Sequence, residues 1–314
     1  MKTLKPKALK RGDVIGVIAP ASPLPSMDRV EKGAEYLERL GYRVTFGKNF
    51  RAVRGFLAGS DKQRAADINT MFGDKKIKAI LAARGGYGSP RVLPLLDYSL
   101  IRRNPKILIG YSDLTALQLA LFKKAGLISF SGPMLGIEMF KGIDPFTEEQ
   151  FWRMVTSTKK FGLLQNPGGR DLKPFHGGKG SGSLLGGNLS IITSIAGTPY
   201  LPSFKNSIFY FEEVDEDSYR FDRMMNQAKL CGIFKEANGI LIGELTNVKP
   251  YDPSTPHLTI DQILADHLSG LRKPILRGLV YGHIPRKLTL PIGIRASIDG
   301  THGLVELLES TVQE

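Results

Sequence analysis

The stretch Lys106-Ile-Leu-Ile-Gly-Tyr-Ser-Asp-Leu-Thr-Ala-Leu-Gln-Leu-Ala120 predicts a buried strand, a tight turn and a helix in immediate succession. Residues 107–109 are consecutive apolar residues, and leucines recur after them without Gly or Pro. Ser112 therefore lies at the carboxyl edge of a sheet and near the positive end of a helix, where an exposed hydroxyl and its alkoxide are favoured. A serine before Asp113 and Thr115 is also an ordinary helix cap, and this stretch alone leaves both interpretations open.

The first 135 residues alternate strand-like and helix-like segments, which predicts an open, mostly parallel α/β sheet with helices on both faces. The predicted strands are 14–19, 42–46, 77–83 and 106–109, and the predicted helices are 27–40, 61–72, 90–96 and 113–125. In such sheets, ligands bind beyond the carboxyl ends of the strands. Ser112 and the glycine-rich segment Arg84–Gly88 both follow predicted strands at that edge.

A Gly- and Pro-rich segment, 161–182, is predicted to be a linker between two domains. The first domain, 1–160, holds the alternating pattern, and the second, 183–314, is expected to be smaller and either mixed α/β or β-rich. The predicted strands of the second domain are 208–211, 239–242, 275–280 and 292–298, and its predicted helices are 219–230 and 260–268. A chain of 314 residues is long enough to form both cores.

The composition, 42% hydrophobic and 23% charged, is typical of a soluble globular protein. No apolar run approaches the roughly 20 residues that cross a bilayer, so no membrane segment is expected. The basic first ten residues lack the apolar run of a signal peptide and are expected to be a solvated tail. The single cysteine, Cys231, excludes an internal disulfide, fits a reducing cytoplasmic location and is expected to be a small buried residue.

The net charge of +13 suggests nucleic-acid binding as one hypothesis. Lys and Arg are spread along the chain, however, and neither a zinc-finger spacing nor an RNA-binding aromatic pattern is present. We therefore expect no specific nucleic-acid partner and at most a weak attraction to polyanions.

The segment Arg84-Gly-Gly-Tyr-Gly88 follows a predicted buried strand. Its glycines can adopt positive φ and turn backbone N–H groups toward an oxyanion, but a tight turn explains the same glycines. The first strand-to-helix turn, 20–25, contains no glycine, which argues against a dinucleotide-binding fingerprint. A Walker A pattern is also missing from the sequence.

Glu212 and His283 each follow a predicted buried strand of the second domain. A carboxylate in that position can orient a histidine, whereas the acidic residues 213–217 are interpreted as a solvated loop. A lone histidine is more often structural, but Ser112, Glu212 and His283 occur in the order nucleophile, carboxylate, base. The same order occurs in α/β-hydrolases, but the sequence around Ser112 lacks the second glycine of G-x-S-x-G, which disfavours that fold.

Seven motifs occur in one order between Asp13 and Asp299. They are Ala83-Arg-Gly-Gly-Tyr-Gly88, Gly110-Tyr-Ser-Asp113, Gly182-x-Leu-x-Gly-Gly-Asn-Leu189, Gly197-Thr-Pro199, Phe211-Glu-Glu-Val-x-Glu-x-x-Tyr-Arg-Phe-Asp-Arg223, Gly282-His283 and Leu290-Pro-Ile-Gly293. With these motifs the chain resembles the serine LD-carboxypeptidases, which include muramoyl-tetrapeptide carboxypeptidases and microcin C immunity peptidases. One departure is Ser131, where the family pattern has His before Gly-Pro, and it concerns the local pocket.

The resemblance implies a Rossmann-like amino-terminal domain, a smaller carboxy-terminal domain and a Ser–Glu–His triad at their interface. By position, Ser112 would be the nucleophile, His283 the general base and Glu212 the carboxylate that orients it. The backbone N–H groups of Gly86 and Asp113 would form the oxyanion hole.

The resemblance also implies a substrate, and two residues of the glycine-rich segment are candidates for binding it. Arg84 and Gly85 are expected to bind the substrate, with Arg84 attracting its terminal carboxylate. The implied reaction is cleavage of the amide between an L-centre and a terminal D-amino acid, such as the D-Ala of a peptidoglycan tetrapeptide during wall recycling. The resemblance implies a homodimer, a small peptide or muropeptide substrate, and neither a metal nor an organic cofactor.

Two alternatives stay open at this point. One is a peptidase of the microcin-immunity type that acts on aminoacyl-nucleotides, which an aromatic side chain stacking on adenine would favour. Trp152 is the only tryptophan in the sequence. The other alternative is a non-catalytic binding protein for small acidic ligands on the same two-domain scaffold.

Overall fold

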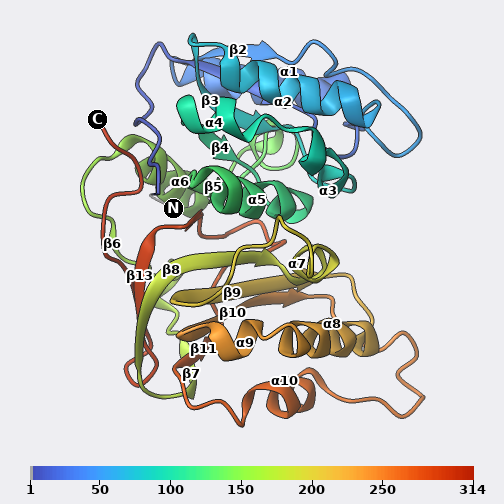
Figure 1. Ribbon diagram of the computed structural model, residues 1–314, viewed down its shortest axis with the longest axis vertical. Coiled ribbons are helices and arrows are strands. Elements are labelled where there is room, and N and C mark those ends of the chain that lie inside the picture. The colour runs from blue at the N-terminus through green and yellow to red at the C-terminus, as the bar shows by residue number, and fades with distance from the viewer. Residues whose placement is uncertain (1–2) are drawn as a thin grey trace. The chain divides into compact units, whose positions relative to one another are not determined.

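The computed structural model describes residues 3–314, which divide into two compact units (Figure 1). The first unit contains the residues up to Lys160 together with Thr289–Gly293 and Ser310–Glu314. The second unit contains Phe161–Leu288 and Ile294–Glu309. The first unit therefore includes two segments from the carboxy-terminal region in addition to the predicted 1–160.

The first unit is built on a six-stranded sheet in the order β12-β5-β4-β3-β1-β2. Its strands are β1 (Val14–Ile18), β2 (Arg43–Phe46), β3 (Ile77–Ala82), β4 (Ile107–Ile109), β5 (Ser129–Ser131) and β12 (Leu290–Ile292). Its helices are α1 (Met27–Arg39), α2 (Asp61–Gly73), α3 (Ser89–Val92), α4 (Tyr98–Arg103), α5 (Thr115–Ala125) and α6 (Pro145–Thr156), with 3-10 turns η1 (Leu93–Leu95), η2 (Ser112–Leu114) and η3 (Met139–Lys141). All neighbouring strands are parallel except β12, which runs antiparallel to β5, so the predicted mostly parallel α/β sheet is confirmed.

Local sequence explains the helices and strands nearest the predicted site. Ser60 and Gln63 form a capping box at the start of α2, with hydrogen bonds of 3.2 and 2.9 Å. Gly126 ends α5 in the left-handed conformation, at φ 72°. These end residues explain where α2 begins and where α5 stops. All three residues of β4 are buried, as expected for a central strand covered on both faces.

The second unit is built on an eight-stranded mixed sheet in the order β6-β14-β13-β8-β9-β10-β11-β7 (Figure 1). Its strands are β6 (Gly162–Leu163), β7 (Lys173–His176), β8 (Lys179–Asn188), β9 (Ser207–Val214), β10 (Gly239–Thr246), β11 (Ile275–Arg277), β13 (Arg295–Asp299) and β14 (Leu304–Leu307). Its helices are α7 (Leu189–Ser194), α8 (Ser218–Leu230), α9 (Ile233–Glu236) and α10 (Ile260–Leu268), with the 3-10 turn η4 (Pro167–Gly169). Strands β8, β9, β10 and β11 are parallel, and the remaining pairs are antiparallel.

The prediction that 161–182 is a linker is wrong. This segment contains β6, β7 and the first part of β8, all within the sheet of the second unit. A Cβ atom on Gly182 would overlap the backbone of Asn206, and one on Gly186 would overlap that of Tyr210. The glycines of β8 are therefore explained by close packing against its neighbours rather than by flexibility.

The predicted strand 292–298 is also wrong, because the chain changes sheets within it. Strand β12 ends at Ile292 in the first sheet, and β13 begins at Arg295 in the second. Gly293 lies between them at φ +98°, a conformation that favours glycine. An apolar run in the sequence does not show that its two halves belong to different sheets.

Three smaller predictions need correction. Cys231 is exposed at the end of α8 rather than buried. Residues 1–2 of the predicted solvated tail lie outside the described residues, and residues 3–10 are not a solvated tail, since Leu9 is buried and donates its N–H to the Val155 carbonyl at 2.9 Å. The predicted helix 90–96 is divided into α3 and η1. Within residues 3–314, no helix combines the length and apolar character needed to cross a membrane.

We expect Gly293→Ala to destabilise the first unit. An added Cβ would lie 2.5 Å from the Phe122 ring, at a φ that side chains rarely adopt. The expected loss in the free energy of unfolding, measured by urea titration, is about 1–3 kcal/mol. Gly270→Ala is the matched control, because a Cβ there meets no described atom within 4 Å. Equal stability of the two variants would contradict the prediction.

Candidate active site

Ser112 lies in a strained turn between β4 and α5. Its φ is 64°, and the preceding Gly110 has φ 154°. The turn η2 begins at Ser112 itself, and the residue that precedes α5, Leu114, makes no side-chain cap hydrogen bond. An N-cap residue has extended backbone, so the helix-cap interpretation of Ser112 does not hold. A non-glycine residue at positive φ between a strand and a helix is the geometry of a nucleophile turn.

The Asp113 side chain ties this turn to the glycine-rich segment Arg84–Gly88, here called the glycine loop. Asp113 is fully buried, and its carboxylate accepts N–H groups from Gly88 at 3.3 Å and Ser89 at 2.7 Å. The Ser89 hydroxyl donates to the Asp113 carbonyl. Burial raises the pKa of this carboxyl, and the donors from Ser89 and Gly88 oppose the rise. Asp113 therefore has a structural role that the sequence did not predict.

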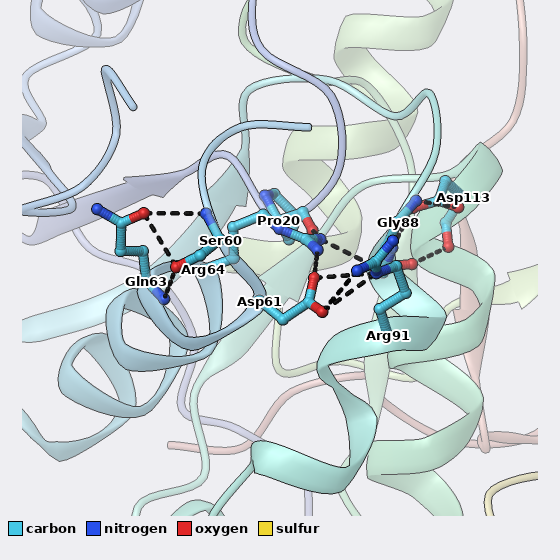
Figure 2. Close-up of polar contacts among 9 residues, drawn as sticks. Pro20, Ser60, Asp61, Gln63, Arg64, Gly88, Arg91 and Asp113 are labelled. Atoms are coloured by element: carbon cyan, nitrogen blue, oxygen red, sulfur yellow. Dashed lines mark hydrogen bonds and ion pairs between the residues drawn. The ribbon is translucent and has the colours of Figure 1, made fainter. Parts of the chain in front are cut away.

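Arg64 holds the glycine loop from its other side (Figure 2). This buried guanidinium donates to the Gly88 carbonyl at 2.8 Å and to the carbonyl of Pro20, just after β1. It also pairs with Asp61 on α2, which in turn pairs with Arg91 at 2.9 Å. Although burial opposes it, the hydrogen bonds from Arg91 and Arg64 lower the pKa of Asp61. The network therefore joins the end of β1, the start of α2 and the glycine loop.

The glycine loop passes directly beside Ser112. A Cβ atom added to Gly85 would lie 2.9 Å from the Ser112 Cβ and 3.1 Å from its Oγ. The Gly85 carbonyl accepts the Ser22 N–H at 3.4 Å, so the N–H of Gly86, on the same planar peptide, points the opposite way. Among the described residues, this N–H has no hydrogen-bond acceptor. Arg84 donates to the Pro23 carbonyl at 3.4 Å.

In the second unit, Glu212 and His283 form a hydrogen-bonded pair. His283 Nδ1 lies 2.8 Å from Glu212 Oε2, and the His283 side chain is 20% exposed while that of Glu212 is completely buried. Glu212 lies within β9 rather than directly after the strand as predicted. The contact to Nδ1 fixes the ring orientation, so a proton transfer at this imidazole would use Nε2.

Two glycines let the His283 loop approach Glu212 closely. A Cβ on Gly282, which has φ +143°, would lie 3.1 Å from Glu212 Oε2. A Cβ on Gly243 would lie 2.7 Å from the Tyr281 carbonyl oxygen. The β9–β10 register shifts at Gly243, and a bulge at this point in a sheet is a common way to aim a side chain.

Asn166 holds the backbone that leads to His283. Its Oδ1 accepts the Val280 N–H at 2.9 Å, and its Nδ2 donates to the carbonyls of Gly278 at 2.9 Å and Arg170 at 3.0 Å. Asn166 belongs to the segment predicted to be a linker, so the sequence gave no reason to connect it with His283. Its hydrogen bonds to Gly278 and Val280 are tertiary contacts that the local sequence does not show.

Asn188 and Glu213 are further site residues that sequence reasoning missed. Glu213 was interpreted as part of a solvated loop, but it is 2% exposed and accepts hydrogen bonds from Asn188 and Ser190. The interpretation is wrong because β9 extends to Val214, which keeps Glu213 inside the sheet. The position of Asn188 before a helical segment was the available sign, since Asn is a common N-cap.

Two other singled-out residues lie in the first unit. Trp152 stacks on Tyr42 with ring centroids 5.0 Å apart and donates to the Tyr36 hydroxyl at 2.8 Å. Ser131 is buried in β5, where it pairs in register with Leu290 of β12. Across residues 3–314, no group of three or more His, Cys, Asp or Glu side chains is placed to hold a metal ion.

We expect Gly85→Ala to lower the reactivity of Ser112 without unfolding the protein. The added methyl would press on the Ser112 side chain, and misplacement of a nucleophile by about 1 Å can cost roughly 10²-fold in rate. The measurement is the labelling rate of Ser112 by a fluorophosphonate probe. Gly73→Ala is the matched control, since its Cβ would meet only the Leu100 side chain, at 3.6 Å. Equal labelling of both variants would argue against the expected contact.

Two family models match the chain, one in each unit. Residues 15–132 match the LD-carboxypeptidase N-terminal domain, and residues 181–298 match the LD-carboxypeptidase C-terminal domain. The matched ranges contain the Ser112 turn and the Glu212–His283 pair respectively.

Individual proteins are similar over nearly the whole chain. A probable murein peptide carboxypeptidase of Bacillus subtilis (strain 168) is 38% identical over 99% of this chain and 96% of its own length. A microcin C7 self-immunity protein, solved as an apo active-site mutant, superposes with a TM-score of 0.89 at 27% identity over 99% of this chain and 100% of its own. A muramoyltetrapeptide carboxypeptidase from Oxalobacter formigenes has a TM-score of 0.81 at 29% identity over 93% of this chain and 97% of its own. The chain belongs to the LD-carboxypeptidase family and is a hydrolase of that family.

Proposed function

We propose that this protein is a serine carboxypeptidase that removes a terminal D-amino acid bonded to an L-centre, with D-Ala of a peptidoglycan tetrapeptide as substrate. The strained Ser112 turn carries the proposal, because a non-glycine residue at φ 64° costs folding energy that a catalytic role explains. The buried Glu212–His283 pair supplies the base and the carboxylate that such a serine needs. The names of the similar carboxypeptidases support the substrate class.

In the proposed mechanism, Ser112, His283 and Glu212 act as a triad. Ser112 Oγ attacks the scissile carbonyl carbon while His283 Nε2 takes the hydroxyl proton. Glu212 stabilises the resulting imidazolium through the Nδ1 hydrogen bond. The C–N bond then breaks, the imidazolium gives its proton to the leaving amine, and the acyl group stays on Ser112. A water molecule, activated by His283, releases the acid in the second half of the reaction.

The backbone supplies the proposed oxyanion hole. The N–H of Gly86 has no acceptor among the described residues, and the N–H of Asp113 belongs to the first turn of a helix, where intrahelical acceptors are lacking. Both segments adjoin Ser112, and the Asp113 and Arg64 side chains fix the glycine loop. Donors held in place before the reaction are the efficient way to stabilise a developing negative charge.

The residues proposed to bind the released D-amino acid lie in the first unit. We propose that Arg84 attracts the terminal carboxylate, since a guanidinium matches its charge and planar shape. Gly85 leaves room for the substrate backbone beside Ser112. The cytoplasmic location and the homodimer expected from the sequence stay predictions.

A second candidate is a peptidase that acts on aminoacyl-nucleotides. The observation in its favour is the similarity to a microcin C7 self-immunity protein, one structure of which holds aspartyl sulfamoyl adenosine. Trp152 does not support this candidate, because it is engaged by Tyr42 and Tyr36 within the first unit. The non-catalytic alternative lacks a reason for the strain at Ser112.

We expect Ser112→Ala to abolish turnover of an L,D-tetrapeptide while preserving the fold. Loss of the nucleophile removes the covalent route, and kcat should fall on the order of 10³-fold or more. Hydrolysis is measured by release of D-Ala, and folding by circular dichroism and thermal unfolding. Ser194→Ala, on a helix of the second unit, is the control serine, since its hydroxyl donates only to the nearby Ile191 carbonyl. Full activity of Ser112→Ala would exclude the proposed nucleophile.

The enzyme should prefer a tetrapeptide with an L-centre–D-Ala bond over an all-L analogue and over a pentapeptide ending in D-Ala-D-Ala. A carboxylate clamp and an oxyanion hole fix two points of the substrate, so inversion of either α-carbon moves the carbonyl off the attack line. A shift of about 1 Å can cost roughly 10²-fold. The measurement is kcat/KM for the three peptides and for an aminoacyl-adenylate. Equal rates on the all-L and L,D peptides would contradict the stereochemical claim, and preference for the adenylate would favour the second candidate.

A further inference from the structure

Glu213 is a buried carboxylate that the proposed mechanism does not use. Glu213 is 2% exposed, and the adjacent Glu212 is 0% exposed. Within the chain from residue 3 onward, Glu213 forms no ion pair with a Lys, Arg or His side chain. Two neighbouring buried carboxylates are costly to keep, because burial removes each from water and their charges repel. The contacts of Glu213 therefore call for a functional explanation.

Three N–H donors hold the Glu213 carboxylate. Oε1 accepts from Asn188 Nδ2 at 2.9 Å and from the Val214 N–H at 3.0 Å, and Oε2 accepts from the Ser190 N–H at 2.7 Å. Burial raises the pKa of Glu213 to about 7, with the neighbouring Glu212 adding to the rise and the three donors opposing it. The three donors favour the ionised form of this carboxyl, which predominates above about pH 7.

The Asn188 amide connects Glu213 to the Glu212–His283 pair. Asn188 Oδ1 accepts the Ile191 N–H at 3.1 Å and caps α7, so the NH₂ group faces the two carboxylates. That nitrogen lies 2.9 Å from Glu213 Oε1 and 3.2 Å from Glu212 Oε1. Glu212 Oε2 in turn contacts His283 Nδ1 at 2.8 Å. A continuous series of hydrogen bonds therefore runs from Glu213 to His283.

We propose that Glu213 is a positioning residue for the Glu212–His283 pair and acts through the Asn188 amide, an inference that rests on the proposed function. An amide nitrogen has two N–H bonds, and Glu213 takes one of them, so the other is aimed at Glu212 Oε1. Because Asn188 holds Oε1 of Glu212, Oε2 stays hydrogen-bonded to the His283 imidazole. The negative charge of Glu213 also adds to that of Glu212 in favouring the protonated imidazole.

The groups packed around Glu213 determine how a change at Glu213 can reach His283. Glu212 is the titratable neighbour on the same strand, while β8 and α7 present the Asn188 amide and the Ser190 N–H. Glu244 on β10 is paired with Arg170 at 2.8 Å. Loss of the Glu213 charge should therefore act on His283 through Glu212 and Asn188.

The test is an NMR titration of His283 in full-length protein labelled with ¹³C-histidine, with a His283→Gln variant to assign its signal among the five histidines. Glu213→Gln should lower the pKa of His283 by about 0.5–1 pH unit, because a nearby negative charge is lost. The acidic limb of kcat/KM against pH should move to lower pH by the same amount, since the base must be neutral. We also expect kcat to fall by about tenfold, with little change in KM.

Glu236→Gln is the matched control. Glu236 also accepts a backbone N–H, from Phe204 at 3.0 Å, and a hydroxyl, from Ser203 at 2.8 Å, but has no contact with the triad residues of its unit. An unchanged pKa of His283 in Glu213→Gln, or an equal change in Glu236→Gln, would overturn the proposal. The NMR readout needs no turnover, so an inactive wild-type enzyme would contradict the proposed function and leave this inference testable.

A second variant tests whether the amide carries the effect. Asn188→Ser keeps a capping oxygen for α7 and removes the group that joins the two carboxylates. If Glu213 acts through Asn188, Glu213→Gln should change the pKa of His283 less in the Asn188→Ser background than in wild type. Equal changes in both backgrounds would overturn the proposal. If Glu213→Gln does not fold, Asn188→Ser alone should change the pKa of His283, and an unchanged value would overturn the proposal.

Discussion

The buried carboxylate of Asp113 is the contact on which the geometry around Ser112 depends. It accepts the N–H groups of Gly88 and Ser89, and the Gly88 carbonyl is held by Arg64. Each of these groups is buried, so a lost partner would leave a polar atom unsatisfied at a cost of about 1–3 kcal/mol. The same contacts hold the strained Ser112 turn beside the Gly86 N–H, which has no acceptor among the described residues. In the first unit, therefore, buried polar contacts fix the conformation of the glycine loop beside Ser112.

The second unit positions His283 against Glu212 by different contacts. Glycines at 243 and 282 bring the backbone of the His283 loop against Glu212, and the amide of Asn166 holds the chain that leads to this loop at Gly278 and Val280. Burial of Glu212 strengthens its interaction with the imidazole, because water does not screen it. Small residues and side-chain amides together hold the hydrogen-bonded Glu212–His283 pair, which an ordinary apolar core would exclude.

The sequence predicted the parallel sheet of the first unit because its strands and helices carry strong periodic patterns and clear end residues, such as Ser60 and Gly126. The prediction from sequence failed where one residue type occurs in two different structural settings. The glycines of β8 resembled a linker, and the acidic run after Phe211 resembled a solvated loop, although Glu213 is buried. Long-range pairing decides such cases, and local composition does not record it.

Chain connectivity also limits which residues can be found from local patterns. Asn166 and Val280 are 114 positions apart, yet one hydrogen bond joins them. The motifs that carry the family resemblance include the proposed triad but give no reason to single out Asn166. Its role follows from its hydrogen bonds to Gly278 and Val280, which only the folded chain shows.

The change of sheets at Gly293 has a consequence for the order of folding during synthesis. The edge of the first sheet at β5 is completed by β12, whose residues are made after nearly all of the second unit. Until then, the backbone groups on that edge of β5 lack their strand partner, and unpaired edges invite aggregation. A nascent chain that has produced the entire first 160 residues therefore still cannot close its first sheet. Completion of the first sheet must therefore wait until the ribosome has made residues 290–292.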